Sequence, residues 1–178
     1  MLEIVTDQHY LSRVPTRTRR GNVAKRPQLD DLDLRLLAHL QDDARITSVE
    51  LARRLKLSAP GLQKRVRKLE QRGVIKGYAT LVSRQAVGLD LLCFVQVLLA
   101  HHRPGSVERF PARIRKLPEV LECYYLTGEI DYLLKVVVAT HDDLERFLFD
   151  KLMKVDGVDR VRTSIVLKEL KASTTLPL

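Results

Sequence analysis

The most regular pattern of hydrophobic and polar positions runs from Leu57 to Gly73. Leu62, Val66 and Leu69 follow one another at helical spacing, so they share one side of a helix. At 100° per residue, the other side carries basic and amide side chains: Lys64, Arg67, Lys68 and Gln71, with Gln63 near its edge. Ser58 is placed to cap the start. The pattern therefore predicts a helix with an apolar packing face and a cationic outer face.

Two shorter helical patterns precede this helix. The first covers residues 30–41, with Asp30 as its N-cap, and the second covers residues 47–55 and begins with capping-box spacing. The residues of the second helix expected to point inward are Val49, Ala52 and Leu55. About three residues join the last two helices, which is helix-turn-helix geometry with the third helix exposed as the reader. Residues 74–78 then predict a short strand, so the unit is winged-helix-like.

Strand-like and helix-like patterns alternate in the second half of the chain. The expected strands cover residues 91–100, 120–127, 132–139 and 158–168. Helices are expected over residues 106–117, where Pro111 shortens or kinks the helix, and from Asp142, as N-cap, to about residue 154. The order is βαββαβ, a ferredoxin-like arrangement, and the fold class of the whole chain is α+β.

These patterns divide the chain into four parts. They are an N-terminal arm (1–28), the helix-turn-helix unit (29–78), a linker (79–90) and the βαββαβ domain (91–178). The arm has no acid between Gln8 and Leu29 but six scattered basic residues, so its composition suggests a flexible basic segment. It either touches DNA or is a tail without a role.

The first and third strands of the second unit are apolar on both alternating sets of positions. Two helices can cover only one face of the sheet. The other face is therefore expected to meet a second sheet, most simply from another copy of the chain. The alternative, that residues 170–178 cover this face, offers too little chain.

Positive charge is concentrated around the predicted third helix. Residues 52–79 hold nine Lys and Arg against one acid, a local charge of +8 out of the chain's +9. A solubilising surface would spread this excess, whereas a polyanion binder concentrates it. Base or groove contacts are expected from Ser58, Gln63, Lys64, Arg67, Lys68 and Gln71, and phosphate contacts from Arg53, Arg54 and Lys76. Arg65 lies closer to the apolar stripe and is expected to pair with an acid of the fold.

Other classes of protein fit the sequence less well. The longest apolar run has about ten residues, too short to cross a membrane, and no secretory signal is evident. Cys93 and Cys123 are expected to be buried free thiols in a reducing cytoplasm. The five histidines lack metal spacing and no phosphate loop or nucleophile motif occurs, so we expect no metal, cofactor or catalytic residue. An RNA-recognition module would need aromatic residues on a central strand, and Tyr132–Val136 lacks that pattern.

The chain resembles the Lrp/AsnC family of transcription regulators over about residues 29–178. The N-terminal unit matches at Leu29-Asp30-Asp31-Leu32-Asp33, Ala44-Arg45-Ile46, Val49-Glu50-Leu51-Ala52, Leu57-Ser58, Arg65-Val66-Arg67-Lys68-Leu69-Glu70 and Gly73-Val74-Ile75-Lys76-Gly77-Tyr78. The C-terminal unit matches at Thr127-Gly128-Glu129-Ile130-Asp131-Tyr132-Leu133-Leu134 and Arg162-Thr163-Ser164-Ile165-Val166-Leu167-Lys168-Glu169. Two departures are an arm longer than usual and Ala44 where the family commonly has Gly.

The resemblance implies a cytoplasmic, nucleoid-associated regulator that binds double-stranded DNA as a homodimer and assembles further, often into octamers. It also implies an amino-acid effector bound between dimers, with Gly128, Asp131 and Thr163 as candidate contacts. A glycine permits positive φ, and Asp131 could accept from an amino group. The alternative is that this turn is chosen only for its geometry.

Overall fold

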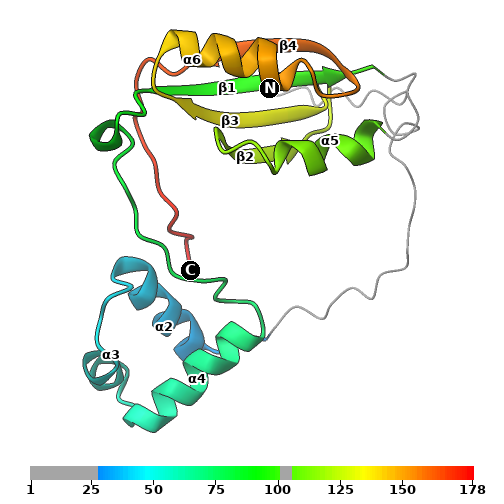
Figure 1. The fold of residues 1–178 in the computed structure, drawn as a ribbon. Coiled ribbons are helices and arrows are strands. Elements are labelled where there is room, and N and C mark those ends of the chain that lie inside the picture. Colours follow the sequence, from blue (N-terminus) through cyan, green and yellow to red (C-terminus); the bar gives the residue numbers. More distant parts are fainter. Residues whose placement is uncertain (1–27, 101–105) are drawn as a thin grey trace, which may run out of the picture. The chain divides into compact units, whose positions relative to one another are not determined.

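The structure, a computed structural model, describes residues 28–100 and 106–178. They form two compact units, which Figure 1 colours along the sequence. The helical unit contains residues 28–81 and 171–178, and the sheet unit contains 82–100 and 106–170. The arm expected over residues 1–28 lies outside the described residues except for its last residue. No helix in the described part of the chain has the length and hydropathy needed to span a membrane.

Three helices make up most of the helical unit: α2 (Asp31–Asp42), α3 (Ser48–Leu55) and α4 (Ala59–Gln71). They confirm the predicted helix-turn-helix. Their buried contacts come from one side of each helix, and the core residues are Leu36, Leu51, Ala52, Leu55, Leu62 and Leu69. Burial of these apolar side chains is what holds the three short helices together, because isolated helices of this length are marginal in water.

Polar caps fix where each helix starts. Asp30 and Asp33 form a reciprocal capping box, in which the Asp33 N–H donates to Asp30 Oδ1 at 2.7 Å. Thr47 and Ser58 each accept from the backbone N–H three residues on, at 3.2 and 3.3 Å. Between α3 and α4, Lys56 adopts the left-handed conformation with φ 54°. This turn sets the direction in which α4 leaves α3.

Two expectations for this unit were wrong. Val49 does not point inward: it is 74% exposed, and Leu51 is buried instead. Val49 lies in the first turn of α3, about 110° around the helix axis from the centre of the side that Leu51, Ala52 and Leu55 bury. The predicted strand over residues 74–78 is also absent. A strand needs a hydrogen-bonding partner, and in the described residues this segment instead turns back at Gly73 (φ 68°), where Val74 N–H donates to Leu69 O at 2.9 Å.

The sheet unit has the predicted βαββαβ order. Its elements are β1 (Leu91–Leu99), α5 (Ser106–Ile114), β2 (Val120–Tyr125), β3 (Tyr132–Val138), α6 (His141–Arg146) with its continuation η2 (Phe147–Leu152), and β4 (Val158–Ile165). The strands form one antiparallel sheet in the order β2-β3-β1-β4. In the linker, residues 85–87 form a short 3-10 turn, η1 (Gln85–Val87).

Several element ends differ from the expected ones. The helix expected to begin with Asp142 as N-cap is capped by Thr140, which forms a reciprocal capping box with Asp143. The helix is α-helical only as far as Arg146 and continues as the π-helix η2. α5 ends at Ile114 rather than at residue 117, with Pro111 inside it. Residues 171–178 lie with the helical unit rather than with the sheet domain, where the Gln41 side-chain amide binds Leu176 N–H at 2.7 Å and Leu176 O at 3.2 Å.

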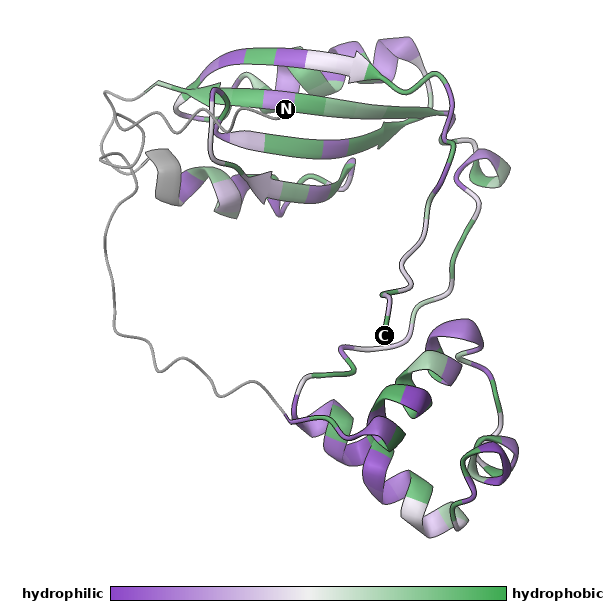
Figure 2. Ribbon diagram, turned by 180° about the vertical axis from the view of Figure 1, so that it is seen from behind, coloured by the Kyte–Doolittle hydropathy of each residue, from purple (hydrophilic) through white to green (hydrophobic). Residues whose placement is uncertain are grey.

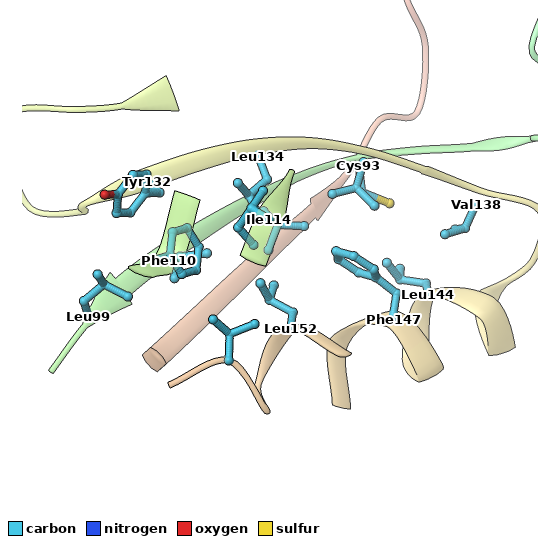
Figure 3. Close-up of a cluster of buried hydrophobic side chains, with 14 residues drawn as sticks. Cys93, Leu99, Phe110, Ile114, Tyr132, Leu134, Val138, Leu144, Phe147 and Leu152 are labelled. Atoms are coloured by element: carbon cyan, nitrogen blue, oxygen red, sulfur yellow. The ribbon is translucent and has the colours of Figure 1, made fainter. Parts of the chain in front are cut away.

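The core of the sheet unit lies between one face of the sheet and the helices. Alternate residues of β1 and β3 meet Phe110 and Ile114 of α5 on that face. Figure 3 shows Leu144, Phe147 and Leu152 pointing from α6 and η2 toward the strands. All three are buried.

The opposite face of the sheet is apolar along its two central strands. In Figure 2, β1 and β3 are green over most of their length. Leu92, Phe94 and Leu98 of β1 and Leu133 and Val137 of β3 alternate with the core residues. Phe94 is 36% exposed. Because both helices of the unit pack on the core face, the pairing of this second face with another copy stays a prediction.

Arg65 of α4 forms ion pairs with two acidic residues at the start of α2. Its Nη1 donates to Asp30 Oδ2 at 2.7 Å and to Asp33 Oδ1 at 2.6 Å, as expected for an arginine turned toward the fold. Asp33 is buried, so its carboxylate depends on this partner. The hydrogen bond from Arg65 lowers the pKa of Asp30. The pair therefore stabilises the fold above the ordinary carboxyl pKa, and this contribution is lost as the pH falls through the lowered value.

We expect Arg65→Ala to lower the free energy of unfolding by about 1–3 kcal/mol, because it leaves the Asp33 carboxylate buried without its charged donor. Urea unfolding followed by circular dichroism measures this loss. Arg35→Ala removes an exposed cation from α2 and should change the stability by less than about 0.5 kcal/mol. Equal stability of the two variants would show that the Arg65 bridge does not hold α4 in place.

Candidate DNA-binding and effector sites

The outer face of α4 brings together five of the predicted DNA-contacting residues. They line one shallow depression of about 540 Å³ beside Pro60, and are Gln63, Lys64, Arg67, Lys68 and Gln71. All five are exposed, while Leu62 and Leu69 on the other side of the helix are buried. None of the three cations has an ion-pair partner among the residues that the structure describes. Their donors therefore face outward and are available to a polyanion.

Ser58 and Lys76 flank this face at the two ends of α4. Ser58 is exposed and caps the helix, so its oxygen is occupied by Gly61 N–H while its hydroxyl hydrogen remains a donor. Lys76 is exposed beyond the end of the helix. The segment that carries it is tied back by Tyr78, whose hydroxyl donates to Glu70 Oε1 at 3.2 Å. Burial, followed by the Glu70 charge, raises the pKa of Tyr78.

Arg53 and Arg54, the predicted phosphate contacts on α3, share one carboxylate. Arg53 donates to both oxygens of Glu50, at 2.9 and 2.8 Å, and Arg54 Nε donates to Oε1 at 2.7 Å. These bonds lower the pKa of Glu50 to about 2, so it is ionised at neutral pH. The capping-box spacing of Thr47 and Glu50 does not indicate this clamp, whereas the spacing of three and four residues from Glu50 to the two arginines on one helix does.

Arg72 holds the end of α4 and was not singled out from the sequence. Its Nη2 donates to the backbone oxygen of Gln28 at 2.8 Å. Together with Arg65, this contact fixes α4 against the segment that leads into α2. Two of the basic residues in the region of high charge therefore also serve the fold.

The turn between β2 and β3 has two of the predicted effector residues. Gly128 has φ +118°, a conformation that residues with a side chain rarely adopt. Asp131 is buried, and its Oδ2 accepts from Leu99 N–H at 2.7 Å. Its backbone N–H donates to Val97 O at 3.0 Å, and its backbone oxygen accepts from Leu126 N–H at 2.9 Å. Within one chain, Asp131 thus ties the turn to the end of β1.

Thr163, the third predicted effector residue, lies elsewhere in the chain. It is on β4 and pairs with Val95 of β1. Because β1 lies between β3 and β4, the structure does not bring Thr163 together with Gly128 and Asp131 within one chain.

An aromatic cluster beside the turn was not predicted. The ring of Tyr132 lies 4.5 Å from that of Phe110 and 5.0 Å from that of Tyr125, measured between centroids. Burial of Tyr132 raises its pKa to about 12, so the phenol stays protonated. Next to it, a depression of about 500 Å³ is lined partly by Cys123. Cys93 is buried as expected, but Cys123 is exposed because the side of β2 on which it lies is only partly covered.

No group of three or more His, Cys, Asp or Glu side chains within residues 28–100 and 106–178 is placed to hold a metal ion. The two sites offer hydrogen-bond donors, charges and apolar walls. α4 offers cationic and amide donors to an extended anionic surface. The β2–β3 turn offers a glycine backbone and an aromatic wall to a small molecule.

Comparisons with known proteins agree with this division. Residues 29–76 match the winged helix-turn-helix DNA-binding family, and residues 92–176 match the Lrp/AsnC ligand binding domain. The leucine-responsive regulatory protein of Rhizobium meliloti is 41% identical over 146 residues, which are 82% of this chain and 94% of that protein. That of Escherichia coli K12 is 38% identical over 154 residues, or 85% of this chain and 94% of that protein.

Solved structures agree as well. A transcriptional regulator from Neisseria meningitidis, in complex with L-Met, has a TM-score of 0.80 and 39% identity, covering 84% of this chain and 97% of its own. Escherichia coli AsnC has a TM-score of 0.77 and 31% identity, covering 84% and 99%. The Rhizobium meliloti and Escherichia coli K12 relatives are regulatory proteins, and the Neisseria meningitidis protein is a transcriptional regulator. The chain belongs to the Lrp/AsnC family of DNA-binding transcriptional regulators.

Proposed function

We propose that this regulator reads its operator with the outer face of α4 and changes its DNA binding when the sheet unit binds a free amino acid. The observation that carries the first part is the set of five exposed side chains on α4, which includes three cations without a partner among the described residues. Arg and Lys donate to guanine edges and phosphates, and Gln pairs with adenine in the major groove. A rigidly held helix with these side chains has the chemistry for direct readout.

The second part is supported by the β2–β3 turn and by one relative. L-Met is bound to the Neisseria meningitidis regulator, so L-methionine is the first effector to test. Since Thr163 lies apart from Gly128 and Asp131 within one chain, we infer that a second copy completes the effector site. The apolar outer face of β1 and β3 supports a homodimer, and we propose further assembly, such as an octamer, in the cytoplasm on the nucleoid.

The test is fluorescence anisotropy of the purified protein on its own upstream DNA and on scrambled DNA, across a salt series and with a panel of amino acids. We expect tighter binding to the upstream fragment and a change of affinity with one or two amino acids. Equal and steeply salt-dependent binding to both DNAs, without an amino-acid effect, would leave only a nonspecific basic surface.

Arg67→Ala should weaken binding to the upstream DNA by about 1–3 kcal/mol and reduce the discrimination between upstream and scrambled DNA, because Arg67 lies on the exposed face of α4. The same anisotropy measurement gives both quantities. Lys168→Ala, which removes an exposed cation from the sheet unit, is the control and should leave both nearly unchanged. An unaltered affinity and salt slope in Arg67→Ala would remove this residue from the interface.

Glu50→Gln should tighten binding to DNA of any sequence, because it frees the guanidinium groups of Arg53 and Arg54 from their shared carboxylate. We expect a steeper salt dependence, with the slope increasing by up to about one counterion. Asp42→Asn makes the same change of charge at an exposed position of α2 and serves as the control. If both variants bind alike, Arg53 and Arg54 do not approach the phosphates.

A further inference from the structure

A second depression in the sheet unit lies at the end of β3 that is remote from the β2–β3 turn. It has a volume of about 390 Å³, within the range of small-molecule sites. Gly128 and Asp131 precede β3, whereas this depression begins at Val137 and Val138, where β3 ends. Six steps along a strand cover about 20 Å. The depression is therefore separate from the candidate effector site at the turn.

The floor of the depression is apolar and its rim is charged. Val138 and Phe147 both belong to the buried core, and Figure 3 shows them at the same end of it, while Val137 next to them lines the depression from β3. Charged groups around them come from the residue before β2 and from the helical segment after β3: Glu119, Asp143, Arg146 and Lys151. Two acids and two bases make this rim neutral overall. A ligand with one positively and one negatively charged group complements such a rim better than a simple cation or anion.

Glu119 is the unusual member of this group. Its backbone oxygen accepts from Val137 N–H at 2.9 Å, which fixes its place beside β3. One carboxylate oxygen, Oε1, pairs with the Lys151 ammonium group. The other, Oε2, is buried and has no hydrogen-bond partner among the described residues. A buried carboxylate oxygen without a donor is costly, so such an atom calls for a donor that the isolated chain does not supply.

The π-helical segment η2 places two cations on the same side of the depression. Arg146 and Lys151 are five residues apart, and in an α-helix they would point about 140° away from each other. In a π-helix, residues five apart follow one another by one turn, as the bond from Met153 N–H to Leu148 O at 2.9 Å illustrates. Short π segments are frequent at functional sites. Here the segment brings both side chains to one rim.

Arg146 keeps donors available to a ligand. Asp143 is engaged on both oxygens: Oδ2 accepts from Thr140 N–H at 3.1 Å and from its hydroxyl at 2.7 Å, and Oδ1 accepts from Arg146 Nη2. The Arg146 side chain is 67% exposed. A guanidinium group has five N–H donors, and the bond to Asp143 uses one of them. The remainder can bind a carboxylate in the two-pronged geometry that arginine favours.

We propose that this depression is a second small-molecule site, which binds an α-amino acid with an apolar side chain. The ligand's carboxylate binds Arg146, and its ammonium group donates to Glu119 Oε2 after a small rotation of that carboxyl group. The apolar side chain packs on Val138 and Phe147, where the core opens into the depression. This site goes beyond the proposed function, because its occupancy depends neither on DNA binding nor on the β2–β3 turn.

Isothermal titration calorimetry of the full chain with L-leucine, L-methionine and L-valine tests the proposal. Arg146→Ala and Glu119→Gln should each weaken one binding event at least tenfold. Two analogues of L-leucine, 4-methylpentanoate without the amine and 3-methylbutylamine without the carboxylate, should bind this site at least tenfold more weakly than L-leucine. Lys154→Ala removes a cation whose described partner is Asp150, outside the depression, and should change nothing.

Thermal unfolding identifies a variant that has lost its fold, and Arg146 is exposed enough for Arg146→Ala to fold even if Glu119→Gln does not. A Gly128→Ala variant separates the two sites, since it should retain the event that depends on Arg146. The proposal is overturned if the wild-type chain binds none of the three amino acids, if Arg146→Ala binds them all as the wild type does, or if Gly128→Ala abolishes every event. DNA is absent from these titrations, so failure of DNA recognition has no influence on the result.

Discussion

The helical unit depends on the bridge that Arg65 makes to Asp30 and Asp33. α4 must bury one side against α2 and α3 and present the other side to DNA, and an apolar stripe alone tolerates some rotation of a helix about its axis. A guanidinium group held at 2.6–2.7 Å from two carboxylates tolerates much less. The same two acids cap α2, so the start of the first helix and the orientation of the last are fixed together. This arrangement determines which face of α4 is exposed.

The sheet unit is governed by a different constraint. The helices α5, α6 and η2 pack on one face of a four-stranded sheet, and β1 and β3 have apolar residues on both faces. A lone chain leaves Phe94 partly in water, which is unfavourable for a large apolar side chain. The pair of Lys135 and Glu122, 3.1 Å apart on that same face, gives it a polar feature that could set the register of a second sheet.

Sequence patterns predicted the features of this structure that depend on residues close together in the sequence. The helices of the first unit, the βαββαβ order and the inward turn of Arg65 follow from helical spacing, alternation and charge. The patterns failed where the conformation of a segment depends on partners that are distant in the sequence. Residues 74–78 have the composition of a strand but no pairing strand within the described ranges, and Tyr78 binds Glu70 instead. Two further features depend on competition between alternative local hydrogen bonds. One is the sharing of the Glu50 carboxylate by two arginines, and the other is the π-helical form of η2. Asp131 was recognised as special, but its bond to Leu99 requires knowledge of the sheet order.

That bond also bears on how a ligand could engage Asp131 at the β2–β3 turn. A ligand that displaced the Leu99 N–H from Oδ2 would leave this donor without an acceptor, at a cost of about 1–3 kcal/mol. Such a ligand would bind about 5- to 150-fold more weakly than its contacts alone suggest. A regulator that follows the supply of a nutrient gains from this weakness, because a site that saturates at trace concentrations cannot distinguish scarcity from plenty. At the proposed effector site, a ligand that displaced this bond would therefore act only at higher concentrations than one that left it in place.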